Sequence, residues 1–109
     1  MSYNVITIRT FEKQAKRLLK KYPSLKQELS DLISSLKVNP EQGIPLGNNS
    51  YKIRLSIFSK GKGKSGGARV ITHVYIQDIT VILLTIFDKS EQSNITDKDI
   101  RLLLKQIPI

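Results

Sequence analysis

Lys52, Arg54 and Arg69 are the residues whose types and spacing could carry chemistry, and that chemistry would act on phosphate esters. Lys52 and Arg54 are two apart on a predicted strand, so their side chains leave the same face about 7 Å apart. A lysine crowded by like charges gives up its proton more readily and could act as a base, while an arginine stays charged and could stabilise a phosphorane. Such a set could promote attack of an RNA 2′-hydroxyl on the neighbouring phosphate without a metal ion. The alternative, solvated cations on an exposed strand face, stays open.

A glycine-rich run, KGKGKSGGAR, covers residues 60–69 and ends at Arg69. It lies within a longer stretch, residues 42–77, that contains no Asp or Glu. Residues 61–66 match the dinucleotide-binding spacing G-x-G-x-x-G, but a strand rather than a helix follows, so nucleotide binding is not expected. The run is instead expected to form a loop that contacts RNA phosphates through its amides and ammonium groups. Its lysines are Lys60, Lys62 and Lys64.

Further candidates follow the loop. His73 is the single imidazole of the chain, and the alternation of its strand places it on the face of Arg69; it could be a general acid or base, or a packing residue. Tyr75, on the same face, could stack on a base or fill the core. Residues 88–91 leave a buried strand and combine a cation with carboxylates, either as part of the site or as a solvated turn. The candidates there are Lys89 and Glu91.

The composition favours a polyanionic partner. The 109 residues include 18 Lys and Arg against 9 Asp and Glu, a net charge of +9. One histidine and no cysteine leave nothing with which to build a disulfide framework, a thiolate zinc site or a multi-histidine centre, so no metal or cofactor is expected. The N-terminus lacks the pattern of a secretion signal and no apolar run is long enough for a membrane span, which favours a cytoplasmic protein with no membrane partner. The length favours one domain, residues 1–109.

The elements that must position these residues begin with a strand and a helical hairpin. Alternating apolar residues predict the strand, and apolar residues three and four apart predict the two helices. Thr10 is the expected N-cap of the first helix, and Ser24 with Gln27 is the expected capping box of the second. The connection is short, so the helices should be antiparallel. The expected bounds are residues 3–9 for the strand, 10–22 and 24–38 for the helices, and 39–50 for a loop rich in Pro, Gly and Asn.

The second half predicts three strands and a helix. Period-two alternation covers residues 51–58 and 68–76, and residues 79–87 are apolar on both faces, as in a central strand. Thr96 with Asp99 forms a capping box for the last helix. The order β-α-α-β-β-β-α defines an α+β domain. We expect a mostly antiparallel, four-stranded twisted sheet with an N-terminal helical hairpin and a C-terminal helix.

Three motifs in order after the helical hairpin resemble the RelE/ParE superfamily of toxins, specifically its HigB-like branch: YKIRL at residues 51–55, GKSGGARVI at 63–71 and LLTIFDKSE at 83–91. The resemblance spans nearly the whole chain, and the family fold coincides with the predicted order of elements. It implies a ribosome-dependent mRNA endonuclease that cleaves message in the A site and inhibits translation. The implied partners are mRNA on the ribosome, ribosomal RNA and a cognate antitoxin of the helix-turn-helix kind.

The resemblance also assigns roles by position. Lys52 and Arg54 match the basic pair on the second strand of these toxins, with the lysines in base and charge-stabilising roles. Arg69 matches the arginine on the next strand that contacts the scissile phosphate. Lys89 falls at the start of the loop after the last strand, near a further arginine of other members.

The sequence departs from the family pattern at two positions. Ser90 stands where that further arginine is expected, and Thr96 stands where other members have a stacking tyrosine. Lys89, Glu91 or the lysines of the glycine-rich loop could protonate the leaving oxygen instead.

Two other functions remain open on the same sequence. A ParE-like toxin would act on a protein such as gyrase, although the carboxylate-free stretch argues against this target. A non-catalytic RNA-binding or ribosome-binding module would share the salt-sensitive binding but not the cleavage.

Overall fold

The computed structural model describes residues 2–61 and 66–107 and confirms the predicted α+β fold. Three α-helices and a five-stranded sheet, in the strand order β1-β5-β4-β3-β2, make up the domain. In chain order the elements are β1 (Asn4–Thr7), α1 (Arg9–Lys21), α2 (Leu25–Val38), β2 (Ile44–Gly47), β3 (Ser50–Leu55), the short 3-10 helix η1 (Phe58–Lys60), β4 (Ala68–Tyr75), the 3-10 helix η2 (Ile76–Asp78), β5 (Thr80–Asp88) and α3 (Asp97–Leu104).

The sheet has one strand more than the sequence predicted, because β2 forms within the expected loop. Asn48 and Asn49 both have positive φ angles, 52° and 62°, and bring Gly47 opposite Ser50. A two-residue turn with two positive φ angles matches the twist of a hairpin, so it fixes β2 against β3. Pro45 is compatible with this strand because β2 lies at an edge of the sheet.

Strand β5 is an interior strand of the sheet, between β1 and β4, as its apolar sequence predicts. It pairs in parallel with β1 and antiparallel with β4, and its residues from Val81 to Asp88 are all buried. Beyond the end of β1, helix α1 covers the free edge of β5: the side-chain oxygen of Gln14 accepts hydrogen bonds from the Ile86 amide at 3.1 Å and the Thr85 hydroxyl at 2.6 Å. The Gln14 side chain therefore bonds to the edge of β5 beyond the residues that pair with β1.

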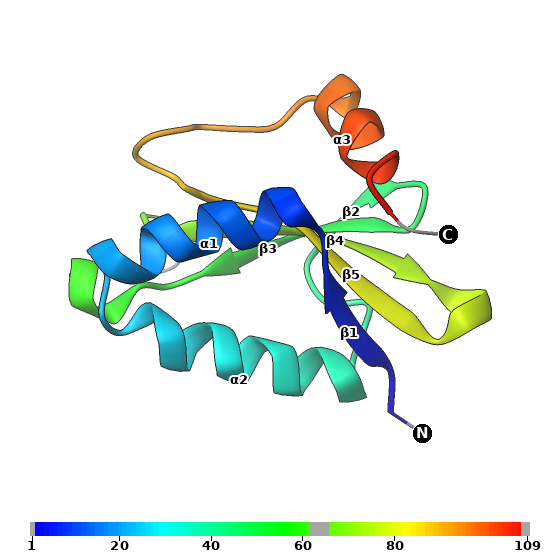
Figure 1. The fold of residues 1–109 in the computed structure, drawn as a ribbon, viewed down its shortest axis with the longest axis horizontal. Coiled ribbons are helices and arrows are strands. Elements are labelled where there is room, and N and C mark those ends of the chain that lie inside the picture. The colour runs from blue at the N-terminus through cyan, green and yellow to red at the C-terminus, as the bar shows by residue number, and fades with distance from the viewer. Residues whose placement is uncertain (1, 62–65, 108–109) are drawn as a thin grey trace.

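Helices α1 and α2 run side by side as a hairpin, and α3 lies apart from them, near the turn between β2 and β3 (Figure 1). The predicted capping box of α3 is present, because the Asp99 amide donates to Thr96 Oγ1 at 3.1 Å and the Thr96 amide donates to Asp99 Oδ2 at 3.3 Å. The hairpin presents one apolar row from each helix to the core. These buried residues are Phe11, Ala15, Leu18, Leu25, Leu29, Leu32 and Leu36.

The other two predicted caps are wrong, because tertiary contacts take both hydroxyls. Helix α1 begins at Arg9 after Ile8, and Thr10 Oγ1 donates to Gln106 Oε1 at 2.8 Å. Ser24 precedes α2 without a side-chain cap bond, and Ser24 Oγ instead donates to Glu28 at 3.0 Å and contacts Ser59. In the described part of the chain, no helix is both long and apolar enough to cross a bilayer.

Candidate functional site

The antiparallel pairing of β3 and β4 gathers the three predicted cations on one face of the sheet. Arg54 is directly opposite Arg69, and Lys52 is opposite Ile71. Side chains of directly opposed residues leave the same face with their Cβ atoms about 5 Å apart, and Lys52 follows at about 7 Å along β3. We call Lys52, Arg54 and Arg69 the cation cluster.

Arg69 differs from the expected solvated cation because its residue is only 5% exposed. Its guanidinium donates to the carbonyl oxygen of Ala68 at 3.1 Å. Burial lowers the pKa of Arg69, and the charge of Arg54 lowers it further. Arg54 itself is exposed and Lys52 is half-buried. Like charges directly opposite each other destabilise a sheet, so an anion bound between the two arginines would be favoured electrostatically.

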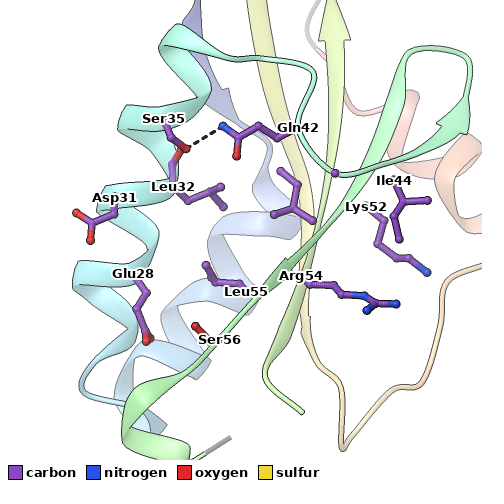
Figure 2. A pocket seen from close by; sticks show the side chains of 12 residues that line it. Glu28, Asp31, Leu32, Ser35, Gln42, Ile44, Lys52, Arg54, Leu55 and Ser56 are labelled. Atoms are coloured by element: carbon purple, nitrogen blue, oxygen red, sulfur yellow. Dashed lines mark hydrogen bonds between the residues drawn. The ribbon is translucent and has the colours of Figure 1, made fainter. Parts of the chain in front are cut away.

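A hollow of about 740 Å³ lies between α2 and β3, and Lys52 and Arg54 of the cation cluster are among its lining residues. Figure 2 shows Glu28, Asp31 and Leu32 of α2 on one side of β3, while the side chains of Lys52 and Arg54 point away from α2. Glu28 and Asp31 would repel phosphate on the α2 side, so the sheet face that carries the cation cluster is the candidate site.

A buried polar cluster lies where β5 ends. Asp88 is fully buried and accepts hydrogen bonds from Tyr22 Oη at 2.5 Å, from the Ser90 amide at 3.0 Å, from Ser90 Oγ at 2.7 Å and from Lys60 Nζ. Burial alone would raise the pKa of Asp88, but the hydrogen bonds from Lys60, Tyr22 and Ser90 outweigh it and hold the pKa well below its usual range. The carboxylate is therefore ionised and fixed.

Lys60, expected to bind RNA, is directed inward to this cluster. Besides Asp88, its ammonium donates to the carbonyl oxygen of Gly66 at 3.0 Å and to Ser90 Oγ at 2.9 Å, and its side chain is 12% exposed. Lys60 therefore ties both flanks of the glycine-rich loop to the end of β5. The other two predicted loop lysines, Lys62 and Lys64, lie outside the described residues.

Lys89 and Glu91 leave β5 in different directions. The Lys89 amide donates to the carbonyl oxygen of Gly67 at 3.0 Å, so the Lys89 backbone lies beside a residue that is two positions before Arg69. The Lys89 side chain turns elsewhere, because its Nζ donates to the Ser93 carbonyl at 2.5 Å. Glu91 turns to α1 and pairs with Arg17 at 2.6 Å and with Lys21 at 3.3 Å. The hydrogen bond from Arg17 is the main cause that lowers the pKa of Glu91.

His73 and Tyr75 lie far along β4 from Arg69. They are four and six residues away, which corresponds to about 13 and 20 Å of strand. His73 is opposite Ser50, with 3.3 Å between Nδ1 and the Ser50 hydroxyl, and burial lowers its pKa. Tyr75 packs partly buried against the core. The structure thus groups Lys52, Arg54, Arg69 and the Lys89 backbone. His73 is a diagonal neighbour of Lys52 on the same face, and Tyr75 lies further along β4.

The sequence interpretation missed the contact between Tyr22 and Asp88, which joins residues 66 apart. An aspartate that directly ends a fully apolar strand is a signal for such a buried partner, because a carboxylate is seldom buried without one. The number and identity of the donors, in contrast, depend on the tertiary structure.

The fold and the site define a class: a small α+β domain with a cation cluster on one face of an antiparallel strand pair. Residues 5–107 match the family described as the RelE toxin of the RelE/RelB toxin-antitoxin system. The chain therefore belongs to the RelE toxin family.

Solved structures share this fold over most of the chain at low sequence identity. A mutant of the E. coli toxin RelE with two arginines changed to alanine, in the free state, is 14% identical, with a TM-score of 0.62 over 98% of this chain and 99% of that chain. The isolated E. coli RelE toxin, also 14% identical, has a TM-score of 0.58 over 97% of this chain and 100% of the other. A metal-bound toxin from Helicobacter pylori, 20% identical, has a TM-score of 0.53 over 83% and 98%.

Proposed function

We propose that this toxin is a ribosome-dependent mRNA endonuclease of the HigB-like branch that cleaves message in the A site and so inhibits translation. We further propose that it acts in the cytoplasm and that a cognate antitoxin protein with a helix-turn-helix domain neutralises it. Membership in the RelE family supports the toxin role. The single observation that carries the nuclease proposal is the cross-strand pair of Arg54 and Arg69 with Lys52 on the same face.

The proposed reaction is a transesterification within the message. Lys52 is the general base, which accepts the proton of a 2′-hydroxyl while that oxygen attacks the adjacent phosphorus. Arg54 and Arg69 bind the non-bridging oxygens, on which negative charge increases in the phosphorane. The bond from phosphorus to the 5′-oxygen then breaks, and Lys89 donates the proton to that oxygen. The products are a 2′,3′-cyclic phosphate and a free 5′-hydroxyl.

Across residues 2–61 and 66–107, no three His, Asp or Glu side chains gather where they could hold a metal ion. The two arginines of the cation cluster could supply the positive charge that a metal supplies in other nucleases.

Expression of the protein tests the proposal. We expect growth arrest, and primer extension should reveal new codon-linked 5′ ends on translated messages. Arrest with intact messages would reject the nuclease and favour a ParE-like action on a protein, if DNA damage signalling appears, or a non-catalytic ribosome-binding module, if it does not.

Arginine variants test the site. Arg54→Ala removes an exposed charge, so the fold should remain while cleavage falls by about 100-fold or more. Arg69→Ala should reduce cleavage similarly, but Arg69 is buried, so circular dichroism melting must accompany it. Lys37→Ala removes an exposed cation from the end of α2 and is the charge-matched control. If Arg54→Ala cleaves as well as Lys37→Ala, the site assignment is wrong.

A further inference from the structure

Phe58 carries the most exposed large apolar side chain of the described residues, at 85%. All other exposed large apolar residues in the described part of the chain are aliphatic, so Phe58 is the one aromatic residue among them. The aliphatic ones are Ile6, Leu19, Val38, Ile44, Ile76 and Leu102. Single exposed apolar residues are common, and exposure alone would not indicate a function. The hydrogen bonds that fix the backbone on both sides of Phe58 are what indicate a function.

The backbone around Phe58 is fixed by side chains of the helical hairpin. The Phe58 amide donates to Glu28 Oε2 at 2.8 Å, and the Ser59 amide donates to Ser24 Oγ at 2.9 Å. These amides are therefore bonded to α2 and its cap residue, whereas strand alternation was expected to continue to residue 58.

The turn η1 is closed within itself as well. The Lys60 amide donates to the carbonyl oxygen of Ile57 at 3.1 Å, and the Gly61 amide donates to that of Phe58 at 2.9 Å, with Gly61 at a φ of 72°. Ile57, directly before the ring, is fully buried. The phenyl group thus stands in solvent on a backbone that is bonded on every side, and its position is set in advance.

Phe58 also lies at the end of the sheet where the two arginines meet. Arg54 and Arg69 form the pair next to the last of the β3–β4 ladder, and η1 follows β3 after two residues (Figure 1). Phe58 is four positions after Arg54 in the chain, so their Cα atoms are at most about 14 Å apart. An extended RNA strand with a phosphate at the arginines could place a base, a few nucleotides along, on the ring.

We propose that Phe58 is a stacking platform for one unpaired base of single-stranded RNA. The inference rests on the proposed function only in that RNA crosses the cation cluster. An exposed aromatic ring on a fixed backbone suits stacking because every base offers a π-surface and the ring has only two side-chain torsions to order on binding. Glu28 supports this choice over direct phosphate contact, since its carboxylate lies beside the turn and would repel phosphate there.

Phe58→Trp tests the inference with a reporter at the position itself. The chain contains no tryptophan, so emission from this variant comes from residue 58 alone. We expect quenching when a single-stranded 12-nucleotide oligoadenylate or vacant ribosomes are added. Quenching by the oligonucleotide indicates a message base, quenching by vacant ribosomes alone indicates ribosomal RNA, and either supports stacking.

Affinity for fluorescein-labelled oligoadenylate or for ribosomes, whichever probe quenches, separates stacking from general apolar contact. Phe58→Leu keeps an apolar side chain without a π-face and should weaken binding about 5- to 100-fold, while Phe58→Trp should bind at least as well as the wild type. Ile76→Ala removes an exposed apolar side chain from η2 and should leave affinity unchanged.

Absence of quenching by either RNA probe, together with wild-type affinity of Phe58→Leu, would overturn the inference. A blue shift of the tryptophan emission with antitoxin, but no response to RNA, would overturn it in favour of a protein contact. The outcome is independent of the nuclease test: quenching by RNA without message cleavage by the wild type keeps the stacking and rejects the nuclease, whereas cleavage without quenching does the reverse.

Discussion

Asp88 and Lys60 are a charge pair at the end of β5 that is almost removed from solvent, with side chains 0% and 12% exposed. Desolvation of two charges is costly, and here Tyr22 and Ser90 satisfy further lone pairs of the carboxylate. Because the same lysine holds the Gly66 carbonyl, the pair connects the loop before β4 to the loop after β5. These contacts hold the chain segments on either side of Arg69 and Lys89 together.

Asp88→Asn should lower the free energy of unfolding by about 3 kcal/mol, because it leaves the Lys60 ammonium buried without its counter-ion. Chemical denaturation followed by circular dichroism measures this loss. Lys60→Met should cost a similar amount, and the double variant should lose less than the sum of the two, as expected for groups in direct contact. Glu91→Gln, which breaks an exposed pair, is the control and should cost less than about 1 kcal/mol.

The pH dependence of the free energy of unfolding is a second test of whether the Asp88 carboxylate stabilises the fold. The pKa of Asp88 is lower in the folded protein than its ordinary value of 3.8, so its contribution is present above that value and is lost as the pH falls below it. Wild-type stability should therefore fall more steeply below pH 3.8 than that of Asp88→Asn. Parallel curves for the two proteins would show that the carboxylate is not specifically stabilised.

At the scale of elements, Gly67 is the point where the glycine-rich loop enters β4 and passes close to β3. A Cβ at Gly67 would overlap the carbonyl oxygen of Leu55, and the Gly67 carbonyl also accepts the Lys89 amide. Only a residue without a side chain fits here, for reasons of space rather than of φ. The close approach sets the end of the β3–β4 ladder one pair beyond the two arginines.

Gly67→Ala should destabilise the fold by about 2 kcal/mol or more, since the backbone of β3 or β4 must shift to make room. Gly47→Ala is the informative comparison. Gly47 has open space around it but a φ of +90°, so its substitution should cost only the conformational strain, about 1 kcal/mol. Thermal melts of both variants measure the difference, and an equal or smaller loss for Gly67→Ala would contradict the close packing at Leu55.

Sequence periodicity predicted the elements well where burial determines them and poorly where a distant partner does. Alternation in β3 and β4 was enough to place Arg54 and Arg69 on one face, because period two permits only two orientations. It did not show that Arg69 is buried, nor that Lys60 faces inward to Asp88 across 28 residues. The hydroxyl of Thr10 likewise bonds to Gln106, and that of Ser24 contacts Ser59 besides its local partner Glu28.

Strand β2 shows the same limit for a whole element. The sequence IPLG has no alternating pattern, and its strand conformation depends on the β3 edge and on the positive φ angles of two asparagines. The Asn-Asn pair was a usable turn signal, because asparagine tolerates such angles better than most residues. Residues 44–47 therefore form a strand because they pair with β3, and their own propensity did not predict it.

Across the whole molecule, carboxylates of α2 and cations of β3 meet at one hollow. Glu28 and Asp31 line the hollow from α2, and Lys52 and Arg54 line it from β3 with side chains that point away from α2. With a net charge of +9, the folded state also carries general self-repulsion, which salt screens. Salt should therefore act in opposite directions on the stability of the protein and on its binding of RNA.

Raising NaCl from about 50 to 200 mM should raise the melting temperature while it weakens RNA binding. If the three residues of the cation cluster each meet one phosphate of a single strand, the slope of log K against log salt should be about −2. Arg54→Ala should reduce its magnitude by about 0.7, because one counterion fewer is released. Fluorescence anisotropy with labelled oligoadenylate measures both slopes.

Lys37→Ala decides whether this slope reports a localised interface or the overall charge. It removes the same formal charge as Arg54→Ala but from the end of α2. A phosphate bound at the cation cluster predicts an unchanged slope for Lys37→Ala, since the released counterions are those condensed on the phosphates in contact. If both variants flatten the slope equally, RNA is attracted by the net charge alone, and the arrangement of Lys52, Arg54 and Arg69 on one face has no special part in its binding.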